Sequence, residues 1–210
     1  TPEQLVAELV DLLDVAPTGA DHFRGRRKHG GVGRVFGGQV IAQALVSAER
    51  TVAEDRAVHS LHAYFLRGGS EDHEIDYVVA RDFDGNSFSN RRVVARQPGG
   101  PILNFTASFQ RPEEGVHHAD PMPDVPDAES LLSVRELMLR AGAGGLSYEG
   151  RGRMFRPQPI ELRPVDPARW GGLDSGAARQ EIWFRTVAPL PDDPRLHRGI
   201  LAYASDFTLL

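Results

Sequence analysis

Apolar and polar positions along the first third of the chain change their spacing several times. Over residues 3–14 the apolar positions recur at helical intervals, which predicts a short amphipathic helix. A Gly- and Arg-rich stretch over 23–34 follows, where we expect a strand and a loop. From Gly38 to Ala48 helical spacing returns, and this segment carries no charged residue. A helix so poor in charge is predicted to be buried on most sides.

Strand-like segments follow this helix. They cover residues 58–66, 74–81, 87–97 and 102–110. In the last segment apolar side chains share one face and polar side chains the other, which is typical of an antiparallel strand on a core. The sequence Asp84-Gly85-Asn86 indicates a tight turn before the third segment. One buried helix and a meander of antiparallel strands predict an α+β fold in which the sheet wraps around a central helix, the hotdog architecture.

The second half repeats part of this pattern. Residues 112–130 are polar and rich in Pro and Asp, as in a linker. Further elements are predicted at 129–139 (helix), 157–165 (edge strand), 179–187 (strand) and from Arg195 toward Phe207 (helix). We therefore expect three parts, in which the last lacks its meander. They are a hotdog over 1–111, a linker with a short helix over 112–154, and the start of a second, truncated hotdog over 155–210.

Composition excludes several classes of protein. The net charge of -5 and the computed pI of about 5.9 do not fit a nucleic-acid surface, which needs a clustered basic field. The absence of cysteine excludes disulfides, thiolate catalysis and Cys-ligated zinc. No apolar run approaches the roughly 18 residues that span a membrane. We expect a cytoplasmic protein without a membrane anchor or a nucleic-acid partner.

The sequence also lacks the familiar metal and cofactor patterns. His59 and His62 are three apart in a predicted strand and so point to opposite faces, which would not converge on a metal. The run Gly31-x-Gly33-x-x-Phe36 lacks the third glycine of a dinucleotide fingerprint. The run from Gly145 to Gly150 is one residue off a nucleophile elbow. We therefore expect no metal, no cofactor and no Ser-His-Asp triad.

Five runs of the chain resemble the acyl-CoA thioesterase II family. They are VFGGQVIAQAL (35–45), VHSLHAYFLR (58–67), DGNSFSNRR (84–92), ASFQ (107–110) and LAYASD (201–206). The resemblance covers most of the chain in the family's order. It implies a double hotdog in one polypeptide that oligomerises further, and hydrolysis of acyl-CoA to free fatty acid and CoA without a metal.

The resemblance also implies a catalytic residue. The family's catalytic Asp, in the helix of the second hotdog, matches Asp206, which we expect at the start of a buried helix. The Thr or Ser and the Gln that accompany it would lie beyond Leu210, so we expect the protein to be longer than this sequence. From the residues alone, an N-cap or a solvated Asp explains Asp206 as well as catalysis does.

Thioester hydrolysis needs an activated water and a stabilised oxyanion, and thiolate is a fair leaving group. Backbone N–H groups at a helix N-terminus are natural oxyanion donors, so Gly37, Gly38 and Gln39 are candidates. Other candidates each have a structural explanation as well. They are His59 for the acyl or CoA channel, Arg91 and Arg92 for CoA phosphates, and Asn86 and Ser87 at the turn.

Two other functions remain open. A hotdog dehydratase or hydratase would also act on acyl thioesters, but such sites usually pair a His with a carboxylate. A non-catalytic acyl-CoA-binding module would bind the same ligand without releasing thiol. We favour the acyl-CoA thioesterase, acting in fatty acid metabolism as a homo-oligomer.

Overall fold

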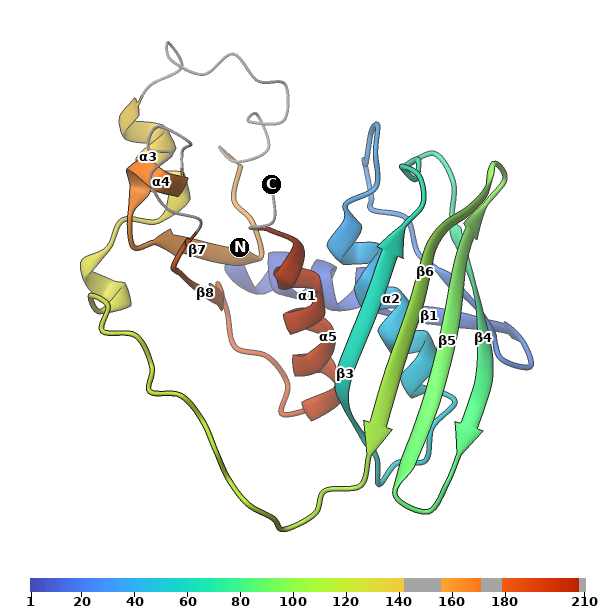
Figure 1. Cartoon of the computed structure of the whole chain (residues 1–210). Helices are drawn as coiled ribbons and strands as arrows, with labels where there is room; N and C mark the ends of the chain where they lie inside the picture. The colour runs from blue at the N-terminus through green and yellow to red at the C-terminus, as the bar shows by residue number, and fades with distance from the viewer. Residues whose placement is uncertain (142–155, 171–178, 208–210) are drawn as a thin grey trace. The chain divides into compact units, whose positions relative to one another are not determined.

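A computed structural model describes residues 1–141, 156–170 and 179–207 (Figure 1). These residues form two compact units. One contains the described residues of Glu8–Gly115 and Pro191–Leu210, and the other those of Thr1–Ala7 and Val116–Leu190. The helix predicted near the end of the chain is therefore grouped with the first hotdog and not with the strands that precede it.

The larger unit contains a sheet of six antiparallel strands in the order β1-β2-β4-β5-β6-β3. These strands are β1 (Val15–Gly19), β2 (His22–Gly25), β3 (Ala57–Phe65), β4 (Ile75–Asp84), β5 (Phe88–Gln97) and β6 (Gly100–Gln110). The predicted strands and the α+β hotdog class are confirmed. Strand β1 was missed because its Pro17 indicated a break; an edge strand tolerates proline.

The expected meander is only partly correct. Strands β4, β5 and β6 follow one another in the sheet, but β3 pairs with β6 instead of β4. The loop from Leu66 to Glu74 carries the chain across the end of the sheet. Gln97 at the end of β5 fixes this loop, because its Nε2 donates to Ser70 O (2.8 Å) and its Oε1 accepts from Ser70 N (2.8 Å).

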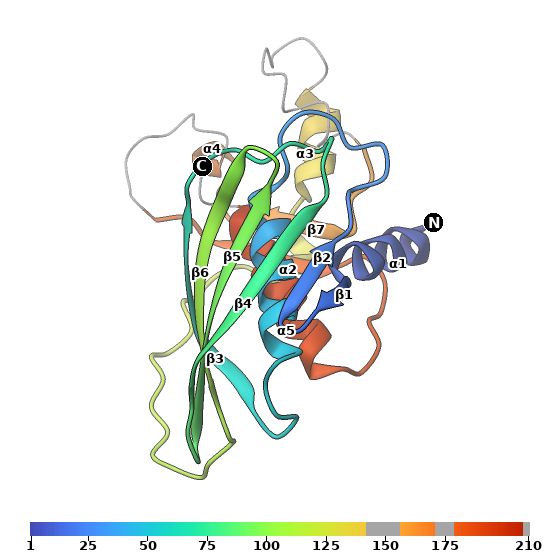
Figure 2. The same cartoon turned by 90° about the vertical axis from the view of Figure 1, so that its right-hand side faces the viewer.

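Helix α2 (Gly37–Glu49) lies against the inner face of this sheet and is the predicted central helix (Figure 2). The alternation predicted for β6 is confirmed, since its inward side chains are at most 1% exposed. These residues are Leu103, Phe105, Ala107 and Phe109. Small buried residues on α2, including Ala42 and Ala44, allow the helix to pack closely on the sheet.

A buried polar network joins α2 to the end of α1 (Pro2–Leu13), to Arg26 directly after β2, and to β4. Gln43 donates from Nε2 to Leu12 O (2.6 Å) and Arg26 O (3.1 Å) and accepts from the Tyr77 hydroxyl (2.8 Å). Burial raises the pKa of Tyr77 well above its usual value, so Tyr77 remains the donor. Every polar atom of the Gln43 side chain is therefore bonded inside the core.

Helix α5 (Pro194–Ala204) packs antiparallel to α2. Its start near Arg195 agrees with the sequence, because Asp193 caps it through a bond from Arg195 N (2.9 Å) and Pro194 occupies its first turn. Near one end of the pair Arg198 Nε lies 3.2 Å from Glu49 Oε1. At the other end α5 reaches the N-terminus of α2.

The smaller unit contains η1 (Ala128–Ser130), α3 (Val134–Ala141), β7 (Ile160–Pro164), α4 (Pro167–Trp170) and β8 (Ile182–Thr186). Strands β7 and β8 pair antiparallel, as two strands were predicted here. The helix predicted over 129–139 begins late. Ser133 and Glu136 form a capping box that starts α3 at Val134, with Ser133 N donating to Glu136 Oε2 (2.8 Å).

Candidate active site

Asp206 lies beyond the C-terminal end of α5, in the 3-10 turn η4 (Ser205–Phe207). The expectation that it begins a buried helix is therefore wrong. Helix α5 starts at its Asp193 cap and has already ended at Ala204. The Ser205 hydroxyl donates to Ala202 O (2.8 Å) in this last turn.

The Asp206 carboxylate caps the other helix of the pair. Its Oδ2 accepts the Gly38 N–H (2.9 Å) at the N-terminus of α2. The residue in the N-cap position of α2, Phe36, provides no side-chain cap. Asp206 thus binds one of the free N–H groups that a helix start leaves, where the helix dipole favours negative charge.

The glycine pair at the start of α2 makes this approach possible. A Cβ at Gly38 would lie 2.2 Å from Tyr203 O, and a Cβ at Gly37 would lie 2.7 Å from Asp206 Oδ2. Both distances are shorter than real Cβ contacts allow. Gly37 also faces the Phe65 ring, at 2.7 Å from Cζ to such a Cβ. Larger side chains here would push η4 away from α2.

Aromatic rings gather beside Asp206, in a group that we call the aromatic wall: Phe36, Phe65, Tyr203 and Phe207. Phe36 stacks on Phe207, with centroids 4.9 Å apart, and meets Tyr203 edge-on at 5.0 Å. Asp206 is half-buried in this environment. Burial raises the pKa of the Asp206 carboxyl, and the Gly38 N–H opposes part of that rise.

These contacts change the role expected for the N-terminus of α2, whose residues Gly37, Gly38 and Gln39 were candidates for oxyanion donors. The Gly38 N–H is bonded to Asp206, and the Gln39 N–H donates to Phe36 O (3.1 Å). The Gln39 side chain is buried and donates to Arg26 O (3.1 Å). The backbone N–H groups of both residues are therefore already bonded and are not the free donors that an oxyanion hole needs. Gly38 positions the carboxylate instead, and Gly37 makes room for it.

Two protein-family models match this chain, one over each half of it. The acyl-CoA thioesterase N-terminal domain matches residues 26–110, and acyl-CoA thioesterase matches residues 157–210. Human acyl-coenzyme A thioesterase 8 is 37% identical over 206 residues, which are 95% of this chain and 65% of the relative. Acyl-CoA thioesterase 2 of Haemophilus influenzae is 36% identical, over 97% of this chain and 71% of the relative. The chain belongs to the acyl-CoA thioesterase II family.

Solved structures agree with this membership. The acyl-CoA thioesterase II TesB2 of Mycobacterium marinum is 37% identical, with a TM-score of 0.70 over 97% of this chain and 67% of that one. The tesB protein of Mycobacterium avium subs paratuberculosis is 30% identical, with a TM-score of 0.73. The match covers 98% of this chain and 70% of that one. The chain spans about two thirds of the length of the curated relatives it matches, 65% for the human protein.

Arg91, a candidate for the phosphates of the thioesterase substrate, is a structural residue. It is 1% exposed on the inner face of β5. Its Nε donates to Thr51 Oγ1 (2.8 Å), and its Nη2 donates to Thr51 O (3.0 Å) and Asp84 Oδ1 (2.7 Å). Its Nη1 donates to two further carbonyl oxygens, those of Phe83 and Asn90. Every N–H of the guanidinium is used, so none remains for a ligand phosphate.

Other candidates lie away from Asp206. Arg92 is exposed and forms an ion pair with Asp82 at 3.2 Å. His59 lies near the start of β3, where its Nε2 is 2.9 Å from Ser108 Oγ and its ring packs edge-on against Phe88. The Phe65 end of β3 is six residues further on, about 20 Å away along the strand.

Asn86 and Ser87 belong to the β4–β5 turn, next to the His59 end of the sheet. Arg56 holds this turn by donating to Gly85 O (2.5 Å) and Asn86 O (3.3 Å), while Ser87 O accepts from Arg111 N (3.1 Å). Their backbone contacts thus have a structural explanation. The structure brings together only Gly37, Gly38 and Asp206 from the predicted set, with Gln39 adjoining.

The aromatic wall is what the sequence reasoning missed. Its four members lie inside or beside the runs that carry the family resemblance, yet none of them was named as a candidate site residue. Rings recurring beside a Gly-Gly pair and beside Asp206 were the available signal. Among the described residues, no group of three or more His, Cys, Asp and Glu could hold a metal. No helix in that part of the chain combines the length and apolar character that crossing a membrane requires.

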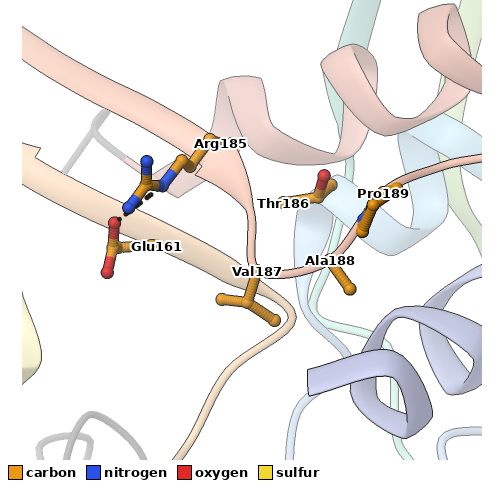
Figure 3. A pocket seen from close by; sticks show the side chains of 6 residues that line it. All are labelled: Glu161, Arg185, Thr186, Val187, Ala188 and Pro189. Atoms are coloured by element: carbon orange, nitrogen blue, oxygen red, sulfur yellow. Dashed lines mark hydrogen bonds and ion pairs between the residues drawn. The ribbon is translucent and has the colours of Figure 1, made fainter.

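A pocket of about 360 Å³ lies in the smaller unit beside β8 (Figure 3). Its lining contains the Glu161–Arg185 ion pair (3.0 Å) and the segment from Thr186 to Pro189. None of the predicted site residues lines it. Its one acid is neutralised by arginine, so the lining offers no free base for thioester chemistry.

Proposed function

We propose that this protein hydrolyses acyl-CoA thioesters to free fatty acid and CoA. The position of Asp206 carries the proposal: a half-buried carboxylate, fixed by a backbone N–H and bordered by aromatic rings. The names of the relatives, which are acyl-CoA thioesterases, support the same reaction.

In the proposed mechanism Asp206 orients or deprotonates the attacking water. The Gly38 N–H holds Oδ2, and no bond from the described residues engages Oδ1, which is left to bind water. The raised pKa makes the carboxylate a better base than an ordinary Asp. Thiolate then leaves without a covalent enzyme intermediate. The aromatic wall offers an apolar surface to the acyl chain.

Thiol release tests the reaction. The whole protein is incubated with short, medium and long acyl-CoAs, and free thiol is measured as it forms. We expect release above the uncatalysed rate for at least one chain length. Binding of acyl-CoA without release of thiol would contradict a hydrolase and would favour the binding module.

One observation favours that second function. Asp206 caps α2, and a capping role alone would explain its position. A non-catalytic acyl-CoA-binding protein would keep the cap and lack hydrolysis. A dehydratase or hydratase has less support, since no described contact of Asp206 involves a His.

The cytoplasmic location, the role in fatty acid metabolism and the homo-oligomer are further proposals. Strand β3 is at the edge of the sheet and carries exposed apolar residues, Leu61, Tyr64 and Phe65 among them. Such an edge can pair with another sheet edge. We also propose that residues 155–210 begin a second hotdog, after a linker over 112–154.

A further inference from the structure

Most arginines of the larger unit are neutralised by a carboxylate. Arg24 pairs with Asp76 at 2.9 Å, Arg81 with Asp21 at 2.8 Å and Arg92 with Asp82 at 3.2 Å. Four exposed arginines differ, because none of them forms an ion pair within the described residues. One is Arg27, which donates from Nε to Glu71 O (2.7 Å), and the other three are Arg34, Arg67 and Arg96.

These three arginines, the arginine cluster, lie around the same loops. Arg34 pairs with Ser70 across an isolated bridge, and its Nε would be 3.3 Å from a Cβ at Gly68, the residue after Arg67. Arg67 donates from Nη1 to Gly99 O in the β5–β6 turn. Arg96 is paired with Pro101 across the same turn. Figure 2 shows these loops at one end of the sheet.

The arginine cluster adjoins the candidate active site. Arg34 is three residues before Gly37, and Arg67 is two residues after Phe65. Gly37 abuts both the Phe65 ring and the Asp206 carboxylate. Only a few residues of the chain therefore separate the arginine cluster from the aromatic wall.

Acidic side chains near these loops are engaged elsewhere. Asp72 accepts from the Ser70 hydroxyl (3.0 Å), and Glu74 lies 3.7 Å from Arg24. The Glu71 carboxylate is buried against Gly31. A cation without a carboxylate partner attracts anions from solution. The free guanidinium groups therefore favour a ligand with several negative charges.

We propose that the arginine cluster binds the phosphate groups at the nucleotide end of CoA. This inference rests on the proposed function, which supplies the ligand. Guanidinium forks match phosphate oxygens in geometry and charge. Arg91 has no N–H left for this contact, whereas Arg34 and Arg67 are exposed and unpaired. The thioester would then extend from the cluster to the aromatic wall and Asp206.

Comparison of two substrates tests the inference. Acyl-CoA carries the phosphates, and the corresponding acyl-pantetheine lacks them. In the whole protein, Arg34→Gln and Arg67→Gln should each raise KM for acyl-CoA about tenfold with little change in kcat, since each removes a charge-assisted contact. Turnover of acyl-pantetheine should stay within twofold. Arg92→Gln is the matched control, because Arg92 is exposed on β5 but paired with Asp82, and it should leave both substrates unaffected.

An equal loss on both substrates, or an unchanged KM for acyl-CoA in both variants, would overturn the assignment. Binding of adenosine 3′,5′-bisphosphate, measured by calorimetry, separates this inference from the hydrolase proposal. If no substrate is hydrolysed but the bisphosphate binds and both variants weaken it, the hydrolase proposal fails and the phosphate site stands. If hydrolysis occurs and the variants bind the bisphosphate as the wild type does, only the phosphate site fails.

Discussion

At the residue scale, the two carboxylate oxygens of Asp206 have different roles. Oδ2 accepts the Gly38 N–H and so completes the start of α2, while the proposed reaction uses the other oxygen. The helix N-terminus favours the ionised form and burial among aromatic rings disfavours it. Burial is the larger effect, so the pKa of the carboxyl is raised.

This raised pKa predicts how hydrolysis depends on pH. A base must be ionised, so kcat/KM should fall as pH decreases through the pKa of Asp206 in the folded protein. The inflection should lie above the ordinary Asp pKa of about 3.9. A pH–rate profile of thiol release measures it. An acid limb at or below the ordinary value would contradict the environment described for Asp206.

The raised pKa of Asp206 also makes the stability of the fold depend on pH. The folded protein binds the Asp206 proton more tightly than the unfolded chain does. Ionisation therefore costs stability as pH rises from the unfolded pKa through the folded pKa. Asp206→Asn removes that cost and can still accept the Gly38 N–H through its amide oxygen. We therefore expect its thermal midpoint at neutral pH to match or exceed that of the wild type.

Gly38 provides a second prediction at this scale. Gly38→Ala would place a Cβ 2.2 Å from Tyr203 O, so α5 and η4 must move away from α2. We expect a loss of about 1–3 kcal/mol in the free energy of unfolding, as for other overpacked sites, together with lost thiol release. Denaturant unfolding and the thiol assay measure the two effects.

Gly199→Ala is the matched control, on the facing helix. Its Cβ would meet Val46 Cγ2 at 3.7 Å, an ordinary contact. Alanine in a helix interior is favoured over glycine by roughly 0.5–1 kcal/mol, so this variant should be at least as stable as the wild type and remain active. Equal behaviour of the two variants would refute the close approach at Gly38.

At the element scale, the α2–α5 pair is joined by polar contacts at both ends. Asp206 and Gly38 join one end, and Glu49 and Arg198 join the other. Glu49 is 6% exposed, and burial raises the pKa of its carboxyl although Arg198 opposes the rise. Arg198 thus favours the ionised form of this carboxylate inside the helix interface.

Arg198→Met should therefore destabilise the helix pair. Removing one partner of a buried ion pair leaves an uncompensated charge, so we expect a loss of about 3 kcal/mol in unfolding free energy at neutral pH. The loss should shrink at low pH, where Glu49 is protonated. Adding Glu49→Gln to Arg198→Met should recover part of the stability. An additive second loss, measured by a double-mutant cycle, would show that the two residues do not interact.

At the scale of the whole molecule, local patterns were predictable and long-range pairings were not. Strand β6 was predictable because one of its faces packs on the core and its sequence alternates accordingly. The pairing of β3 with β6 was not, since nothing local selects a strand's partner. The bond between Gly38 and Asp206 joins positions 168 residues apart, and no spacing rule reaches that far.

Part of the candidate site could nevertheless be predicted from the sequence. The sequence indicated that Arg91 and Arg92 point to opposite faces of their strand, but each face also carries valine, Val93 on one and Val94 on the other. Only the structure shows that the Arg91 face is the buried one. A buried arginine needs its bonds inside the fold, which argues against a ligand role. Asp206 was found through the family resemblance, whereas its place after α5 required the structure.

The most direct test of the account compares Asp206→Asn with the wild type in two measurements on the whole protein: thiol release from acyl-CoA, and acyl-CoA binding. Asparagine keeps the cap on α2 and removes the base. We predict that turnover falls on the order of 10² or more while binding and fold are preserved. Turnover near that of the wild type in a folded variant would contradict Asp206 as the group that activates water.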